Sequence, residues 1–180
     1  GAANVTGMSS NLSYNSAPCL TVAATPKLDK KLAAQVIEDG KTTQLTFTIS
    51  NVLDKPAQAG IGFTDTLPTS WRVADAVVTN SCGGTLTDQN GAPLATGQTG
   101  VRLAGGELAA NAASCQIVVN VTNASGQIND SCSPQAPAWT NAAGNISGEA
   151  NLKAEIATPQ CLLVQSKGLG VATRFERAGT

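Results

Sequence analysis

The sequence predicts an all-β fold, an antiparallel β-sandwich with a strand-like extension at each terminus. Three observations lead to this fold class. Short apolar runs with period two are separated by turn residues along most of the chain. Signals for helices are weak, so the alternating helices that cover a parallel sheet are not expected. The two ends of the chain also resemble each other, which indicates repeated units.

The first strand is expected within Leu28–Val36. This stretch also has some helical propensity, but its position in the repeated unit favours the opening strand of a sandwich. The second strand, Gln44–Ser50, alternates apolar and hydroxyl residues with period two. Its Leu45, Phe47 and Ile49 side chains are therefore expected to face the core.

The third and fourth strands follow directly. Gly60–Leu67 reads as a strand that stops at Pro68, because proline cannot donate to a strand ladder. Trp71–Thr79 is the next strand, and we expect Val73 and Val77 to point inward.

The middle of the chain predicts a hairpin and a long central strand. Thr85–Thr87 pairs across a turn at residues 88–91, where Asn-Gly favours positive φ. Gly100–Leu103 is expected to be a short strand. Cys115–Thr122 holds the clearest β-forming run, and the two prolines of Asn129–Pro137 predict a loop after it.

Trp139–Ile146 and Ala150–Val164 are expected to supply the closing strands. Regular short strands with turns between them predict an immunoglobulin-like antiparallel β-sandwich. The unit is somewhat longer than a simple immunoglobulin-like domain, with its extra length in two loop regions.

The ends of the chain carry the repeat. Asn4 and Cys19, each with its flanking residues, correspond to Asn145 and Cys161. Self-similarity at a fixed offset is typical of domain arrays. The predicted parts are residues 1–25 as terminal strands of a preceding repeat or a donated strand, residues 26–165 as one complete repeat, and residues 166–180 as the opening strand of the next.

The composition argues against several function classes. Charged residues make up 13% of the chain, aromatic residues 3%, and the net charge is −1. We therefore expect no nucleic-acid partner. No apolar run is long enough for a membrane span, so no membrane insertion is expected. Histidine is absent, which removes the commonest general base and metal ligand. We expect no enzyme activity, no cofactor and no metal site.

The cysteines predict disulfides and an oxidising compartment, extracellular or at the cell surface. Cys82 follows one strand and Cys115 opens another, so we pair these two. Cys132 is expected to pair with Cys161 in the final strand. Cys19 is the counterpart of Cys161 and should form an inter-unit disulfide with a neighbouring copy. The alternative for Cys19 is a free, buried thiol.

Several ordered blocks carry a family resemblance. They are Lys31-Leu32 leading into Leu45–Asn51, Phe63–Pro68, Cys82–Thr85, Leu103–Leu108 and Ser114–Thr122, with Thr140-Asn141 near the close. Together they resemble the Ig-like "conserved repeat" domains of bacterial surface and secreted proteins, over about residues 27–164. The resemblance implies a β-sandwich in tandem arrays outside the cell, as stalk, adhesin or matrix material. The Cys132–Cys161 pair and its long loop depart from the simpler members.

Asp65 has two interpretations. In the first, it catalyses a Lys–Asn isopeptide cross-link, as in related surface sandwiches. The amine would come from Lys30 or Lys31, and the amide from Asn141 or Asn151. This chemistry needs the three groups to be buried together, so that the amine stays neutral. In the second interpretation, Asp65 caps the turn that follows it through local hydrogen bonds.

Asn-x-Ser/Thr sequons are candidate glycosylation sites, with ordinary Asn/Thr-rich strand and turn chemistry as the alternative. They stand at Asn4, Asn11, Asn120, Asn123, Asn129 and Asn145.

Together these features predict an extracellular structural protein. The disulfide-stapled repeat would build a cell-surface stalk or filament by end-to-end association, with copies of itself as partners. One alternative is a filament subunit that polymerises by donor-strand exchange, using residues 1–22. The other is an adhesin for a host or matrix ligand, which would need an exposed aromatic patch.

Overall fold

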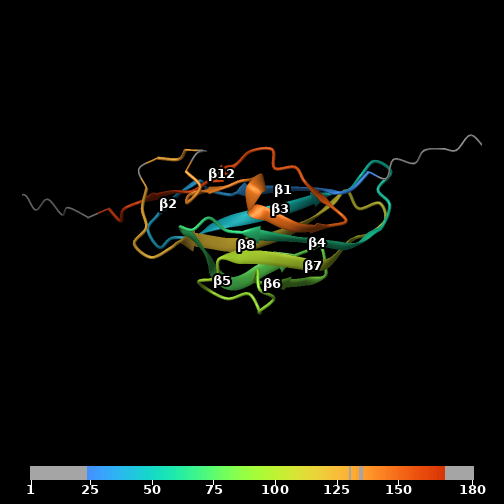
Figure 1. The fold of residues 1–180 in the computed structure, drawn as a ribbon, viewed down its shortest axis with the longest axis horizontal. Helices are drawn as coiled ribbons and strands as arrows, with labels where there is room; N and C mark the ends of the chain where they lie inside the picture. Colours follow the sequence, from blue (N-terminus) through green and yellow to red (C-terminus); the bar gives the residue numbers. More distant parts are fainter. Residues whose placement is uncertain (1–23, 130, 134–135, 169–180) are drawn as a thin grey trace, which may run out of the picture.

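The computed structural model describes residues 24–129, 131–133 and 136–168. Within them the chain is all-β, and the helical piece η2 (Ala143–Asn145) is a single 3-10 turn. No helix among these residues is long and apolar enough to cross a membrane. The predicted terminal extensions, with Cys19, lie outside the described residues. In Figure 1 the blue start of the described chain lies at the right-hand end of the domain and its red end lies at the left.

The larger sheet has five strands in the order β11-β1-β3-β8-β5. Its strands are β1 (Lys27–Leu32), β3 (Thr43–Ser50), β5 (Trp71–Asn80), β8 (Ser114–Asn123) and β11 (Lys153–Ala154). β3 lies in the centre, antiparallel to both β1 and β8. The opening segment is thus a strand, as its place in the repeat predicts, and its helical propensity is overridden by pairing with β3.

The second sheet has four strands in the order β10-β4-β7-β6. Its strands are β4 (Gln58–Thr66), β6 (Thr85–Thr87), β7 (Gly100–Leu108) and β10 (Ile146–Ala150). Two small ribbons complete the fold, β12 (Gln160–Cys161) with β9 (Thr140–Asn141) and β13 (Leu163–Gln165) with β2 (Val36–Glu38).

The hydrophobic core lies between the two main sheets. Leu45, Phe47 and Ile49 of β3 are all fully buried, which confirms their predicted orientation. The ring of Phe47 meets the ring of Phe63 on β4 with centroids 5.1 Å apart. Burial of apolar area at this contact and around it is the main force that holds the layers together.

The prediction that Val77 points inward is wrong. Val73 is fully buried, but Val77 is 72% exposed. The pairing of β5 with β8 shifts register between Val73 and Val78, so Val78 takes the next place opposite β8. Between these two pairs β5 advances five residues and β8 only two, and the odd number of extra residues reverses the inward and outward alternation beyond the bulge. A strict period of two cannot hold across it.

The structure also corrects two predicted strand lengths. β7 does not stop at Leu103 but continues to Leu108, with Gly106 opposite Ile61. Gly105 has φ +69°, and the pairing of β7 with β4 shifts register in this region. The glycines therefore belong to an irregular part of the strand and do not end it. The two expected closing strands are instead broken into five short strands, β9 to β13, and a 3-10 turn.

Both predicted disulfides are present. Cys82–Cys115 closes at an S–S distance of 2.06 Å and lies where the chain leaves β5 for the second sheet. Cys132–Cys161 closes at 2.08 Å and ties the loop before β9 to β12. The two bonds constrain the crossover between sheets and the closing segment of the domain.

Candidate functional site

Three polar side chains meet inside the sandwich. Lys30 Nζ donates a hydrogen bond to Asp65 Oδ1 at 3.0 Å and another to Asn141 Oδ1. Asn141 Nδ2 donates to Asp65 Oδ2 at 2.8 Å. The side chains of Lys30 and Asp65 are both 0% exposed, and Asn141 is also 0% exposed. An amine, a carboxyl group and a carboxamide are thus in mutual contact without access to bulk water.

β1 places Lys30 inside by simple alternation. Leu28, Lys30 and Leu32 are buried, while Lys31 is exposed. Successive side chains of a strand point to opposite faces, so Lys30 shares the inward face with the two leucines. The sequence Lys-Leu-Asp-Lys-Lys-Leu carried this signal, and it selects Lys30 over Lys31 as the buried amine.

Asp65 reaches the same point from the opposite sheet. On β4 it follows the buried Ile61 and Phe63 with the same parity. Its carboxylate oxygens bind Lys30 and Asn141, which are 35 and 76 residues away in sequence. The interpretation of Asp65 as a local turn cap is therefore wrong, since both of its described side-chain contacts are long-range.

Asn141 is held in place by the closing segment. In the β9–β12 ribbon Asn141 lies opposite Gln160, and Thr140 lies opposite Cys161. Gln160 in turn accepts a hydrogen bond on Oε1 from the backbone N of Leu32, at 2.9 Å. The ribbon that carries the amide is thus tied to the strand that carries the amine. The sequence gives no periodic signal for Gln160, and its role was not predicted.

Apolar side chains surround the three groups. Phe47 lies directly opposite Lys30 on the neighbouring strand. Val101 and Ile146 lie opposite Asp65 on its two sides. Directly opposed residues share a face of the sheet, and these three are buried. The site therefore has low polarity and excludes water.

This environment disfavours charge. Burial lowers the pKa of the Lys30 amine, and the nearby Asp65 carboxylate only partly offsets the shift. Burial also raises the pKa of the Asp65 carboxyl group, against the opposing influence of Lys30 and Asn141. Both shifts favour transfer of a proton from the amine to the carboxyl group, because each uncharged form is easier to bury.

The other candidates for the cross-link lie elsewhere. Lys31 is exposed on the outer face of β1. Asn151 is exposed, and its Nδ2 donates to the backbone O of Ala59 at 2.9 Å. Neither is brought into the buried cluster.

The sequon asparagines of the described chain all use Nδ2 as a donor within the protein. The bonds run from Asn120 to Asp75, from Asn123 to Asp39, Ala124 and Gln127, from Asn129 to Ser131 and Leu162, and from Asn145 to Thr66. A glycan is attached through this same nitrogen and replaces one of its two hydrogens, so it would compete with these contacts. The pattern favours the structural interpretation of these residues. Asn4 and Asn11 lie outside the described residues.

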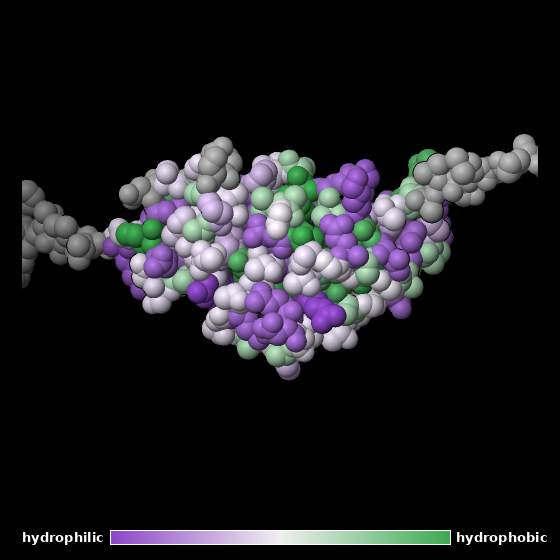
Figure 2. Space-filling view, in the orientation of Figure 1, coloured by the Kyte–Doolittle hydropathy of each residue, from purple (hydrophilic) through white to green (hydrophobic). Residues whose placement is uncertain are grey.

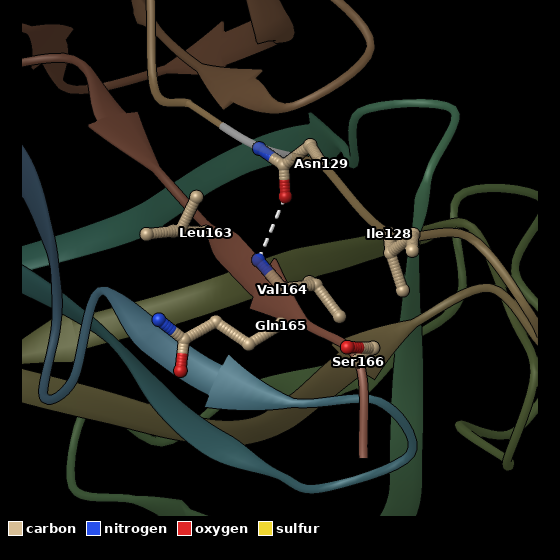
Figure 3. A pocket seen from close by; sticks show the side chains of 6 residues that line it. All are labelled: Ile128, Asn129, Leu163, Val164, Gln165 and Ser166. Atoms are coloured by element: carbon tan, nitrogen blue, oxygen red, sulfur yellow. Dashed lines mark hydrogen bonds between the residues drawn. The ribbon is translucent and has the colours of Figure 1, made fainter. Parts of the chain in front are cut away.

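Figure 3 shows a pocket beside β13, where the Asn129 side chain points toward the backbone of Val164. Asn129 Oδ1 accepts a hydrogen bond from the Val164 N–H at 2.7 Å, and the Asn129 N–H donates to the Val164 carbonyl at 3.1 Å. Asn129 therefore forms hydrogen bonds with β13 in the way that a residue of a neighbouring strand would. Its amide is occupied by this role and not turned toward a ligand.

In Figure 2 the visible face is a mosaic of polar and near-neutral residues, with apolar residues in small separate groups. Across the described ranges, no group of three or more His, Cys, Asp or Glu residues has a metal-binding arrangement.

A comparison with known protein families gives a match over most of the chain. Residues 26–163 match the model of a family described as "Domain of unknown function (DUF7933)". This range includes Lys30, Asp65, Asn141 and both disulfides. Among curated proteins, none matches the chain.

Proposed function

The chain belongs to the DUF7933 family, and from its architecture we propose that residues 26–165 form a load-bearing module of an extracellular stalk or filament. The module would act mechanically, by joining copies of itself end to end.

The parallel pairing of β2, near the start of the domain, with the last strand, β13, is the observation that carries this proposal. β13 runs parallel to β2, with Leu163 opposite Val36 and Gln165 opposite Glu38. The chain therefore enters along β1 and β2 and leaves along β13 in the same direction, at opposite ends of the long axis (Figure 1). Successive copies joined by short linkers would form a line and not fold back on each other.

The parallel pairing of β2 with β13 also suits a domain that resists tension along its long axis. Backbone bonds join Leu163 N to Gln35 O at 2.7 Å and Asp39 N to Gln165 O at 2.8 Å. A pull on the two ends loads these parallel bonds in shear, so several must break together. Opening them one at a time would need less force.

The disulfides and the surface also support an extracellular role. Disulfides persist in oxidising compartments outside the cytosol, and two are present in the domain. The low charge content and near-neutral surface suit a spacer that binds few partners. The similarity between the two ends of the chain supports neighbouring copies of the unit.

The two alternatives receive less support. For donor-strand exchange, both main sheets are already built from strands within residues 27–154. The long edge strand β5 is bulged, and the Gln98 carbonyl and the Gly97 N–H both bond to its Val73. For an adhesin, Trp71, Phe47 and Phe63 are buried, and they offer no aromatic surface.

The native polypeptide tests the proposal. Electrophoresis with and without reductant should give a single chain far heavier than 18.1 kDa, and electron microscopy should show rods one domain wide. An 18.1 kDa subunit that assembles without covalent links would support strand exchange instead. A ladder that collapses on reduction would point to disulfide-linked strand exchange. A short, compact particle that retains a host or matrix ligand would support the adhesin.

A further inference from the structure

The Lys30–Asp65–Asn141 cluster is not explained by stability alone. A buried ion pair seldom stabilises a fold more than apolar residues of similar size would. Here three polar side chains occupy a fully buried position between the sheets. Their arrangement has the features of a reaction site, because a nucleophile, an electrophile and a proton-transfer group are in contact.

We propose that the Lys30 amine and the Asn141 carboxamide join in an intramolecular isopeptide bond, with Asp65 as the catalytic residue and ammonia as the leaving group. The bond would link β1 to β9 permanently. It belongs to the interior of the domain and does not depend on the mechanical role proposed above.

The reaction balances without a cofactor or an oxidant. The lone pair of Lys30 Nζ attacks Cγ of Asn141 and forms a new C–N bond. The bond from Cγ to Nδ2 of Asn141 then breaks. Nζ loses one proton overall, and the departing nitrogen gains one and leaves as ammonia. A lysine amine and a carboxamide thus become a secondary amide and ammonia.

Asp65 is placed to carry that proton. Its Oδ1 lies 3.0 Å from Lys30 Nζ, the nucleophile. Its Oδ2 lies 2.8 Å from Asn141 Nδ2, the leaving group. A carboxyl group can accept a proton on one oxygen while it donates one from the other, so it bridges the two nitrogens and ends unchanged.

The surroundings supply the reactive protonation state. An ammonium group has no lone pair, so the attack needs a neutral amine. Burial lowers the pKa of Lys30 and raises the pKa of Asp65, which favours a neutral amine beside a protonated carboxyl group. The apolar residues opposite both side chains keep water from competing for the Asn141 carbonyl carbon.

The fold also accelerates the reaction by holding the amine and the amide in contact. The amine and the amide are 111 residues apart in sequence and meet only in the folded domain. Holding two reactants in contact replaces an encounter in solution with an effectively unimolecular step. We therefore expect the reaction to follow folding and to need no enzyme.

Intact mass after reduction and unfolding tests the proposal. The full 180-residue chain should be lighter than its sequence predicts by the mass of one ammonia molecule. After digestion, the peptide containing Lys30 should remain attached to the peptide containing Asn141, and trypsin should not cleave after Lys30.

Four variants assign the roles. Lys30→Met and Asn141→Ala should restore the full mass, because each removes a reacting group. Asp65→Asn should restore it in most molecules, because the amide cannot relay the proton. Lys31→Met is the matched control and should still lose ammonia. Formation of Cys82–Cys115 and Cys132–Cys161 reports whether each variant has folded, and Lys31→Met is expected to form both.

Several outcomes would overturn the proposal. One is a folded wild-type chain with both disulfides, an unshifted mass and normal cleavage after Lys30. A second is an ammonia loss that persists in Lys30→Met, which would place the bond or another loss elsewhere. A third is a folded Asp65→Asn chain that cross-links as completely as the wild type, which would remove Asp65 from the chemistry.

Discussion

Lys30 and Asp65 face each other across the two sheets of the sandwich, with Nζ 3.0 Å from Oδ1 and both side chains fully buried. They come from β1 and β4, each of which is the first strand of its sheet along the chain. The contact therefore joins the layers at a point where an apolar pair would normally stand. Its energetic consequence can be measured apart from any cross-link.

Removing one partner of this pair should be worse than removing both. Asp65→Val leaves the Lys30 amine buried without its carboxyl partner, and we expect a loss of about 3–5 kcal/mol in the free energy of unfolding. The double variant Lys30→Met/Asp65→Val should recover much of that loss. Both variants lack a carboxyl group at position 65 and an intact site, so neither gains from an isopeptide bond.

Urea titration of the two variants gives the comparison, with Lys31→Met as the exposed control, expected to stay within about 0.5 kcal/mol of wild type. Equal stabilities for the single and double variants would mean that Lys30 finds another buried partner or reaches solvent once Asp65 is absent.

The strands of the sandwich were predictable because their side chains alternate. Leu45, Phe47 and Ile49 follow a period of two in sequence and are all buried. The same period, applied to Leu28 and Leu32, also singles out Lys30 as the inward lysine. Local alternation is sufficient here because these strands pair regularly with their neighbours.

Asn141 was a candidate only through the family resemblance. It stands in a two-residue strand in which Thr140 and Asn141 are both buried, so no alternation marks it. Its position depends on pairing with Gln160 and on the Cys132–Cys161 bond. Contacts between segments distant in sequence leave no local pattern, and the broken closing strands were missed for the same reason.

The bulge in β5 gives a matched test of side-chain orientation. Val73→Thr places a hydroxyl in the core and should reduce the free energy of unfolding by about 1–3 kcal/mol. Val77→Thr makes the same chemical change at a residue that is 72% exposed, so we expect a change within about 0.5 kcal/mol. Both substitutions keep a β-branched side chain. Thermal or urea unfolding of the two variants measures the difference, and similar losses at both positions would contradict the bulged register.

The two disulfides should differ in their accessibility to reductant. Cys82 and Cys115 are 1% and 6% exposed, whereas Cys132 is exposed in its loop. Thiol–disulfide exchange needs access of a thiolate to sulfur. Graded reduction of the folded chain, followed by alkylation and peptide mapping, should therefore open Cys132–Cys161 first. Simultaneous labelling of the four cysteines of these two bonds would indicate global unfolding before reduction.

Asn129 should act as a structural support for β13. Asn129→Ala removes the acceptor for the Val164 N–H and the donor to the Leu162 carbonyl. We expect a loss of about 1–2 kcal/mol and faster hydrogen exchange within residues 160–165, with β3 unchanged. Ser125→Ala, at an exposed position in the preceding turn, is the control. Unchanged exchange in β13 would show that its pairing with β2 is sufficient.

The cross-link has a mechanical consequence that depends on its place in the chain. Without the cross-link, a force applied at Lys27 and Gln165 can extend all of the backbone between them except the two segments that the disulfides bridge. The backbone that can be stretched then amounts to about 76 residues, or roughly 270 Å when fully extended. With Lys30 joined to Asn141, the load passes directly from β1 to the closing segment. From Asn141 the load reaches Gln165 through the Cys132–Cys161 bond. The backbone that can be stretched then falls to about 16 residues, or roughly 60 Å.

Single-molecule stretching of the domain between identical handles should therefore separate the wild type from Asn141→Ala. The wild type should yield only the short extension, because residues 31–131 carry no load once Lys30 is joined to Asn141. Asn141→Ala should show a long unfolding step, and Lys31→Met should behave as the wild type. The disulfides must stay oxidised in all three, since reduction lengthens every path. A long step in the wild type, from molecules whose mass confirms the cross-link, would mean that the load enters the fold by another route. The short extension in both wild type and Asn141→Ala would mean that the sandwich resists the applied force without the bond.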